Sequence, residues 1–412
     1  MRPRDQRAVR AKRESRAPRA EWGPGPIALV LLVACKSSEK PAKNDVPAVT
    51  ATSAGDAAVA PAMDAAPERK VWITGSGRCG ECHEKMFDEW ETSAHANSVS
   101  SSLYKTAVAS AKDPTCERCH APLAAVAPRD LVVTEGVTCD VCHTLREPRP
   151  SADGGTWTLA VDDMVKFGPR CDLADHYFHR MGCSPEHKQA ELCGTCHWWE
   201  PKGVPVFTEY ADWKAGWAAK DGYPCQSCHM PRDKAAIATG SPVRKGVPHH
   251  GLLGKAKDLR ATALTLEVTL DAQGALAVTV NNKLAGHAVP AGLPERRVVV
   301  RARVKDGGGA ETWHEERSLG RTLVDANNVE VPFWKALRVA SDTRIAAGGS
   351  QAMTFTVPMA PAGTLEIEVV YRGLSDAIAK QLAVTDVEEH PMVKTSLKLG
   401  GRYPKTAKTG KK

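Results

Sequence analysis

Five copies of a Cys-x-x-Cys-His sequence constrain this chain more than any other feature. In each copy two thiols stand three residues apart, and a histidine follows the second thiol directly. Thiols at that spacing can form thioether bonds to the two vinyl groups of one porphyrin, and the adjoining histidine can supply the proximal nitrogen to its iron. The pattern therefore predicts five haem c groups. The attachment thiols are Cys79 and Cys82, Cys116 and Cys119, Cys139 and Cys142, Cys193 and Cys196, and Cys225 and Cys228; the proximal histidines are His83, His120, His143, His197 and His229.

Cysteine pairs also occur in zinc sites and in thiol redox sites. Histidine makes up 14 of the 412 residues, so the chance that one follows a given pair is about one in thirty. In this chain a histidine follows all five pairs. Zinc sites also combine two pairs into one set of four ligands, which would leave one pair over. Haem attachment is therefore favoured over both alternatives.

The spacing of the motifs limits how the region around them can fold. Residues 79–229 contain all five motifs, which leaves about thirty residues for each porphyrin, too few for a separate apolar core around each one. We expect the porphyrins to form the core, with short helices and long loops outside. The predicted fold class is α+β, with a mainly helical, loop-rich multihaem domain at 71–255 and an antiparallel β-sandwich at 256–400.

Nine histidines lie outside the motifs and are candidates for the distal side of the irons. His95 ends a segment, residues 84–95, whose apolar residues have amphipathic helical spacing. If the helix persists, His95 lies about 18 Å along the chain from His83. Two nitrogens bound to one iron lie only about 4 Å apart. His95 is therefore predicted to bind the iron of a neighbouring haem.

Three further histidines precede the fourth motif. His176 and His179 are predicted to share one face of a helix, because they are three residues apart. His187 stands six residues before Cys193. For each of them a surface or core position is the alternative to binding iron. His314 and His390 have no neighbours that suggest iron, and we expect them at the surface.

Several short elements of the motif region follow a known pattern. They are Cys79-x-x-Cys-His-x-x-Met-x-x-x-Trp90 with Ser93-Ala-His95, Phe178-His179 with His187 and Glu191-Leu-Cys193, Cys225-x-x-Cys-His-Met-Pro, and His250-Gly-Leu-Leu-Gly254. Through them residues 79–255 resemble the multihaem cytochromes related to tetrahaem cytochrome c-554. The resemblance implies distal roles for His95, His179, His187 and His250. The chain departs from the prototype in having five motifs and a further C-terminal domain.

The C-terminal part shows the alternation of β-strands. Residues 264–270 and 276–280 flank an Asp-Ala-Gln-Gly turn, which predicts a hairpin. Further strands are expected at residues 297–304, 353–357 and 365–372. Regularly spaced strands without helical periodicity predict a β-sandwich.

One loop of this β-sandwich, residues 281–294, is rich in glycine and proline and carries His287. It resembles the Asn-x-x-x-Gly-His-x-x-Pro-x-Gly element that joins multihaem cytochromes to such β domains. We interpret His287 as a distal ligand that the sandwich delivers to a haem. The alternative is a histidine that only shapes the loop.

The N-terminus has the pattern of an export signal. Residues 1–21 hold eight Arg or Lys, and the apolar run at 26–34, too short to span a bilayer, ends at Cys35. Leu32-Val-Ala-Cys35 resembles a bacterial lipobox, which predicts lipidation of Cys35; an ordinary signal peptide is the alternative. Residues 36–70 contain few large apolar side chains and are predicted to be a disordered tether. Lys36 after the lipidated cysteine favours the outer membrane.

Two cysteines remain outside the motifs and the lipobox, Cys171 and Cys183. Export places the chain where disulfides persist, so a disulfide is predicted, with two buried thiols as the alternative. The formal net charge of +7 comes from the ends of the chain: residues 1–21 carry +5 and residues 394–412 carry +7, which leaves −5 on the rest. The chain is therefore not expected to bind nucleic acid. Residues 401–412 are predicted to be a basic, disordered tail.

These observations predict an exported pentahaem cytochrome that carries electrons, anchored by lipid on the periplasmic side of the envelope or at the outer membrane. Redox proteins are the expected partners. A haem enzyme that converts a small nitrogen or sulfur oxyanion or a hydroxylamine-type substrate at one five-coordinate iron is the alternative, and a scaffold that binds through its β domain is a third. The carrier is favoured because the chain has enough histidines for all five irons.

Overall fold

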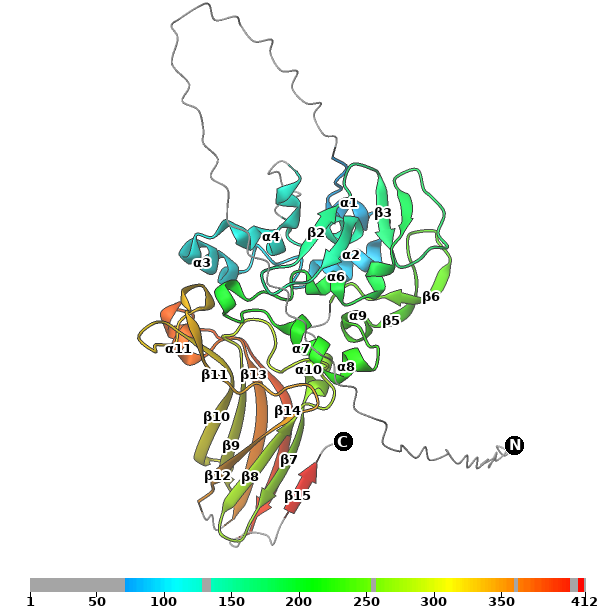
Figure 1. Ribbon diagram of the computed structural model, residues 1–412. Helices are drawn as coiled ribbons and strands as arrows, with labels where there is room; N and C mark the ends of the chain where they lie inside the picture. Colours follow the sequence, from blue (N-terminus) through cyan, green and yellow to red (C-terminus); the bar gives the residue numbers. More distant parts are fainter. Residues whose placement is uncertain (1–70, 128–134, 253–256, 359–361, 401–406, 411–412) are drawn as a thin grey trace, which may run out of the picture. The chain divides into compact units, whose positions relative to one another are not determined.

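The computed structural model describes residues 71–127, 135–252, 257–358, 362–400 and 407–410, all of which belong to one compact unit (Figure 1). The predicted signal peptide, the lipidation site Cys35 and the tether fall in residues 1–70, outside the described residues. The fold class is α+β, as predicted: short helices come first, and antiparallel sheets make up most of the C-terminal half.

The motif region, residues 71–252, contains little regular structure, as expected from its motif density. Its longest helix, α3, has ten residues. The helices are α1 (Ser76–Gly80), α2 (Glu84–Glu91), α3 (Ser102–Ala111), α4 (Glu117–His120), α5 (Cys139–Thr144), α6 (Glu191–Gly194), α7 (Glu209–Ala215), α8 (Trp217–Lys220) and α9 (Cys225–His229), with 3-10 turns at Pro114–Cys116, Pro122–Ala125, Pro185–Lys188 and Pro201–Gly203. The strands pair in twos: β1 (Leu145–Arg149) with β2 (Thr156–Leu159), β3 (Val165–Gly168) with β4 (Arg180–Cys183), and β5 (Arg232–Ala236) with β6 (Val243–Pro248).

The apolar core of this region is small. One cluster of fully buried apolar side chains packs between α5 and the β1–β2 hairpin, and consists of Leu123, Val141, Leu145, Leu159 and Val161. The motif cysteines are only partly buried or, at Cys228, exposed, and they line a common cavity. This is the arrangement expected where cofactors complete the core.

Two local predictions for this region were wrong. Helix α2 ends at Glu91, so His95 follows in a turn and is not helical. His176 and His179 do not share a helical face either. They close a tight turn in which each backbone N–H donates to the carbonyl of the other, at 3.1 Å in both directions. They lie in the loop that the disulfide between Cys171 and Cys183 closes.

The C-terminal part is a sandwich of two antiparallel sheets (Figure 1). One sheet has the strand order β11-β10-β9-β13-β14 and the other has the order β12-β8-β7-β15. The strands are β7 (Thr265–Leu270), β8 (Ala275–Asn281), β9 (Arg297–Asp306), β10 (Glu311–Val324), β11 (Arg338–Asp342), β12 (Ser350–Thr356), β13 (Gly363–Arg372), β14 (Glu389–Leu399) and β15 (Ala407–Gly410). Helix α10 (Lys257–Ala263) precedes the sandwich, and the 3-10 turn η6 (Phe333–Lys335) and α11 (Asp376–Gln381) lie in its connections.

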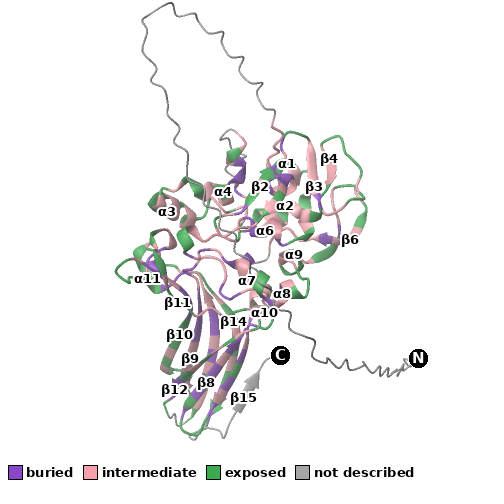
Figure 2. Cartoon of the chain, in the orientation of Figure 1, coloured by how far each residue is buried: buried purple, intermediate pink, exposed green. Residues whose placement is uncertain are grey.

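Apolar side chains recur at every second residue of these strands, which explains why the segments form a sandwich. In β7, Leu266, Val268 and Leu270 are buried, and in β9 Val298, Val300 and Ala302 are buried on the facing side. Alternate residues point to the opposite face of a strand, so each sheet buries one apolar face against the other. Figure 2 shows buried residues following the strands of both sheets.

Residues 407–410, which were predicted to be part of a disordered tail, are ordered in the structure. These residues form strand β15, which pairs with Glu267–Leu270 of β7. Strand β7 would otherwise be an edge strand with unpaired backbone groups, which readily accept a further strand.

The sandwich is joined to the motif region through Arg321 of β10 and Arg344, which follows β11. The buried Arg321 donates to the carbonyl oxygen of Pro205 at 2.7 Å and to Thr208 Oγ1 at 3.2 Å. Arg344 forms an ion pair of 2.8 Å with Asp212, at helix α7. The β domain therefore docks on the motif region and is not an independent module.

Candidate haem-binding site

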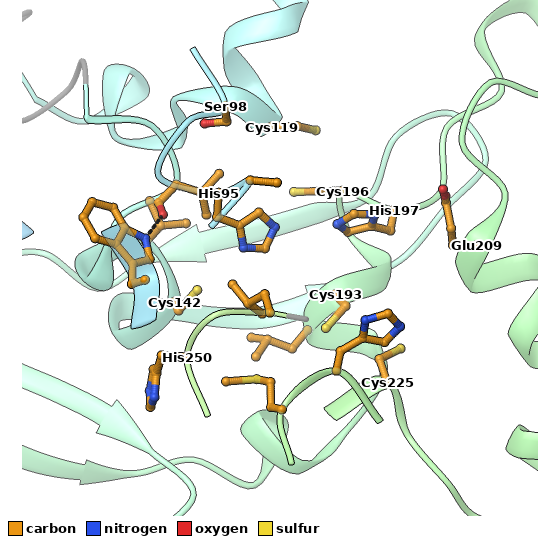
Figure 3. Close-up of a pocket in the computed structure, with 18 of the residues that line it drawn as sticks. His95, Ser98, Cys119, Cys142, Cys193, Cys196, His197, Glu209, Cys225 and His250 are labelled. Atoms are coloured by element: carbon orange, nitrogen blue, oxygen red, sulfur yellow. Dashed lines mark hydrogen bonds between the residues drawn. The ribbon is translucent and has the colours of Figure 1, made fainter. Parts of the chain in front are cut away.

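All five Cys-x-x-Cys-His motifs line one cavity of about 1910 Å³. Its walls come from the helices of the motif region and from the end of the sandwich, including the 281–294 loop. Figure 3 shows part of it, with His95 and His197 directed into the same space and the thiols of Cys193 and Cys196 beside them. The cavity thus brings together residues that are far apart in the sequence.

Each motif forms a single helical turn. The backbone N–H of His83 donates to Cys79 O at 2.9 Å, and that of His197 donates to Cys193 O at 3.0 Å. One turn of helix is about 3.6 residues, so the first thiol, the second thiol and the histidine of a motif are directed toward one side of the backbone. This is the local geometry that attachment of one porphyrin requires.

Thiols of different motifs lie against one another. The neighbouring Cys139 raises the pKa of the Cys79 thiol, which places the first motif beside the third. Cys119 raises the pKa of Cys196, which places the second motif beside the fourth. Cys225 raises the pKa of Cys193, which places the fourth motif beside the fifth. Every motif therefore has another motif as its neighbour.

Four of the motif histidines face a second imidazole. Imidazoles bound to opposite sides of one iron have nitrogens about 4 Å apart and ring centroids about 6 Å apart, at about 2 Å per metal–nitrogen bond. The four centroid distances in the structure are close to that value. The pairs are His83–His179 at 6.2 Å, His197–His95 at 6.1 Å, His143–His250 at 6.4 Å and His229–His287 at 6.2 Å.

Hydrogen bonds orient most of these rings. When Nδ1–H donates to a carbonyl, the other ring nitrogen, Nε2, keeps its lone pair for a metal. This arrangement occurs on motif histidines and on their partners. The carbonyl acceptors are Ile237 for His83 (2.5 Å), Ser98 for His120 (3.0 Å), Phe167 for His143 (2.6 Å), Arg180 for His179 (3.4 Å), Pro248 for His250 (2.9 Å) and Ala288 for His287 (2.9 Å).

Burial keeps the imidazoles neutral. Desolvation lowers the pKa of His95, His229 and His250 to about 4 in each case. Only a neutral imidazole offers a lone pair to iron, so at neutral pH these side chains are in the form that binds a metal. His95 also has a buried Nδ1 without a hydrogen-bond partner. The residues present therefore fit haem groups with two histidine ligands.

His187 lies in a different position from the one implied by the resemblance. Its ring is 5.6 Å from that of His143, the same motif histidine that His250 faces. Both of its nitrogens have partners: Nδ1 lies 2.8 Å from Ser184 Oγ, and Nε2 lies 3.0 Å from Cys142 O. His187 thus lies beside the third motif. It shares His143 with His250 and faces no other motif histidine.

The second motif has no such pair among the described residues. The ring closest to His120 belongs to Tyr104 of helix α3, at a centroid distance of 4.6 Å. Burial raises the pKa of the Tyr104 phenol, which keeps its O–H protonated. Sequence reasoning did not single out Tyr104, because no motif surrounds it.

The loop that carries His287 packs closely against the backbone of helices α7 and α8. A Cβ on Gly286 would lie 2.5 Å from Ala218 Cβ, and a Cβ on Gly216 would lie 2.7 Å from Gly286 O. Trp217 Nε1 donates to Ala285 O at 3.3 Å. The glycine before His287 is therefore needed for the loop to pack on helices α7 and α8, and this packing brings His287 to His229.

Cys171 and Cys183 form a disulfide that closes the loop carrying His179. The loop is also held by β4, which pairs with β3, whereas Tyr177 at its tip is 81% exposed. Cross-linking a loop of about this length contributes about 3 kcal/mol. We predict that Cys171→Ser with Cys183→Ser loosens His179 and converts a fraction of one haem to the high-spin state, measured by electron paramagnetic resonance. Tyr177→Phe, which keeps the disulfide, is the control; an unchanged spectrum in the double variant would contradict the prediction.

The comparisons with known proteins agree with this geometry. Residues 78–144, which contain the first three motifs, match the family described as "Cytochrome c554 and c-prime". This segment belongs to that family. The chain is a multihaem c-type cytochrome, and c-type cytochromes are exported proteins. A search of curated proteins gives no match.

A solved structure shares the fold of this cytochrome. It is a penta-heme cytochrome c552 from Thermochromatium tepidum, with a TM-score of 0.66 and 21% sequence identity. The match covers 79% of this chain and 99% of that one, so the likeness includes the sandwich as well as the motif region. No helix among the described residues is long and apolar enough to cross a membrane.

Proposed function

We propose that this cytochrome carries five haem c groups and transfers electrons among them. The observation that carries the proposal is the single cavity that all five motifs line, because attachment points in one cavity hold their cofactors close together. The penta-heme cytochrome from Thermochromatium tepidum, whose fold this chain shares, supports the number five. Haem supplies the one-electron chemistry, and the protein supplies ligation, spacing and local charge.

The fourth motif has a central position among its neighbours. The pKa values of its two thiols are raised by Cys225 of the fifth motif and Cys119 of the second. Cys142 of the third motif also raises both of these pKa values, and the third motif is the neighbour of the first. These neighbours define an order of motifs: first, third, fourth, and then both second and fifth. We infer that electrons enter and leave at the two ends of this order, which are the first motif and the pair formed by the second and fifth.

Four of the sites have the ligand set of a carrier. Two histidines on one iron leave no open position for a substrate, and they favour a lower potential than His/Met ligation. The proposed iron ligands are the four ring pairs described above. Redox proteins are the proposed donor and acceptor, and a lipid on Cys35 is the proposed anchor on the periplasmic side or at the outer membrane.

The test is electron paramagnetic resonance of the oxidised holoprotein, with the haem content counted alongside. We expect five haems per chain, four of them low-spin. The carrier also predicts reversible reduction of all five haems and their reoxidation by a one-electron acceptor. Fewer than five haems, or fewer than four low-spin signals, would contradict the proposal.

The second motif favours one further function. His120 faces a tyrosine and, among the described residues, no second imidazole, so its iron is the candidate for an open position. We propose that a small ligand of the hydroxylamine, nitrite or sulfite class binds there and that the Tyr104 ring, which packs on His120, orients that imidazole.

This proposal is tested with carbon monoxide. We expect the reduced protein to bind one carbon monoxide per five haems. Absence of carbon monoxide binding would exclude an open iron and leave the carrier function alone.

A further inference from the structure

Two guanidinium groups flank one tyrosine ring where the sandwich lines the cavity. The Arg260 guanidinium, from helix α10, lies 5.3 Å from the centroid of the Tyr371 ring. That of Arg296, from the loop between His287 and β9, lies 5.9 Å from the same centroid. All three side chains line the cavity. The residues come from three separate elements, so the fold brings them together.

The positive charge of this cluster is only partly balanced. Glu388 Oε1 lies 3.7 Å from Arg260 Nη1, and the Glu388 side chain is 44% exposed. Arg296 Nη1 donates to Ala291 O at 2.8 Å, and within the described part of the chain Arg296 forms no ion pair. Two like charges beside one ring repel each other. An anion between them would remove that repulsion.

Besides Glu388, the neighbouring carboxyl group is that of Glu295, which does not supply such an anion. Glu295 is buried, and its Oε1 accepts a hydrogen bond from the backbone N–H of Phe333 at 2.8 Å. Burial raises its pKa, which favours the neutral form. Burial also raises the pKa of the Tyr371 phenol, so its O–H stays available as a donor.

The donor set indicates the class of ligand. A guanidinium presents a planar fork of N–H groups that matches a carboxylate or another oxyanion, and a phenol adds one further O–H donor. We propose that Arg260, Arg296 and Tyr371 form a binding site for one carboxylate-sized anion at the β-domain wall of the cavity.

The source of the anion follows from the position of Arg296. This residue is held by a hydrogen bond to Ala291, four residues beyond His287 in the same loop, and His287 faces His229 of the fifth motif. A propionate of the haem attached at Cys225 and Cys228 is therefore the first source, and this assignment rests on the proposed function. A free oxyanion has the same chemistry and is the second source.

The test uses holoprotein carrying Arg296→Gln or Arg260→Gln. Midpoint potentials are measured by spectroelectrochemistry, and inorganic phosphate is titrated by calorimetry. With a propionate in the site, both variants should shift one of the five midpoints to a more negative value, because a nearby cation stabilises the reduced haem. Phosphate should then give no binding heat in the unmodified protein.

With a free oxyanion in the site, the unmodified protein should bind phosphate, and Arg296→Gln should weaken that binding at least tenfold. The control is Arg303→Gln, an ion-paired position on the outer face of the five-stranded sheet, which should change neither readout. Unchanged midpoints together with unchanged phosphate titrations in both variants would overturn the site. Haem content is counted first, so a missing fifth haem would count against the proposed function and not against this site.

Discussion

Replacing His250 with alanine should convert one low-spin haem to high-spin, whereas replacing His187 with alanine should leave the number of low-spin haems unchanged. His250 faces His143 at the centroid distance that two ligands of one iron require, with its Nδ1 held by the Pro248 carbonyl. His187 lies beside the same ring, but its Nε2 lies 3.0 Å from Cys142 O and is not free for iron. The two histidines are thus distinguished by their hydrogen bonds.

The measurement is electron paramagnetic resonance of both oxidised variants, with haem content as the control for correct maturation. The high-spin iron of His250→Ala should also bind added imidazole and return to low-spin. If His187→Ala produces the high-spin signal and His250→Ala does not, the assignment of the third haem is reversed. If neither does, the pairing of histidines described here is wrong at this motif.

Replacing Arg321 with alanine should loosen the contact between the sandwich and the motif region. Arg321 is 5% exposed and makes two hydrogen bonds across the interface, to Pro205 O and to Thr208 Oγ1. A hydrogen bond from a charged donor contributes about 1.5 to 3 kcal/mol, so the change should lower the free energy of unfolding by about 3 kcal/mol. Loss of the interface should also withdraw His287 from His229 and produce one high-spin haem.

Thermal unfolding followed by circular dichroism measures the first effect, and electron paramagnetic resonance measures the second. Arg338→Ala is the matched control, because Arg338 is an exposed arginine on the neighbouring strand β11 of the same sheet. An Arg321→Ala protein with unchanged stability and an unchanged spectrum would show that the contact does not hold the sandwich in place. A loss of stability without a high-spin signal would show that ligation by His287 does not depend on the Arg321 contact.

The β-sandwich could be predicted well from the sequence, because strand patterns are local. The hairpin expected around residues 271–274 is formed by β7 and β8, and the strands expected near 297–304, 353–357 and 365–372 are β9, β12 and β13. Strands β10, β11 and β14 were missed. Segment 176–179 was misread because two histidines three residues apart suit a helix, while the disulfide and the β3–β4 pairing impose a turn there.

The sequence by itself determined the local geometry of each Cys-x-x-Cys-His motif. Two thiols and a histidine within five residues share one turn of backbone, so their relative geometry is set locally and does not depend on the fold. Only the tertiary structure decided which histidine faces which motif. His179 reaches His83, and His287 reaches His229, through contacts between segments that are distant in the chain. Tyr104 occupies the place beside His120 for the same reason: packing of α3 put it there, and no local pattern marks it.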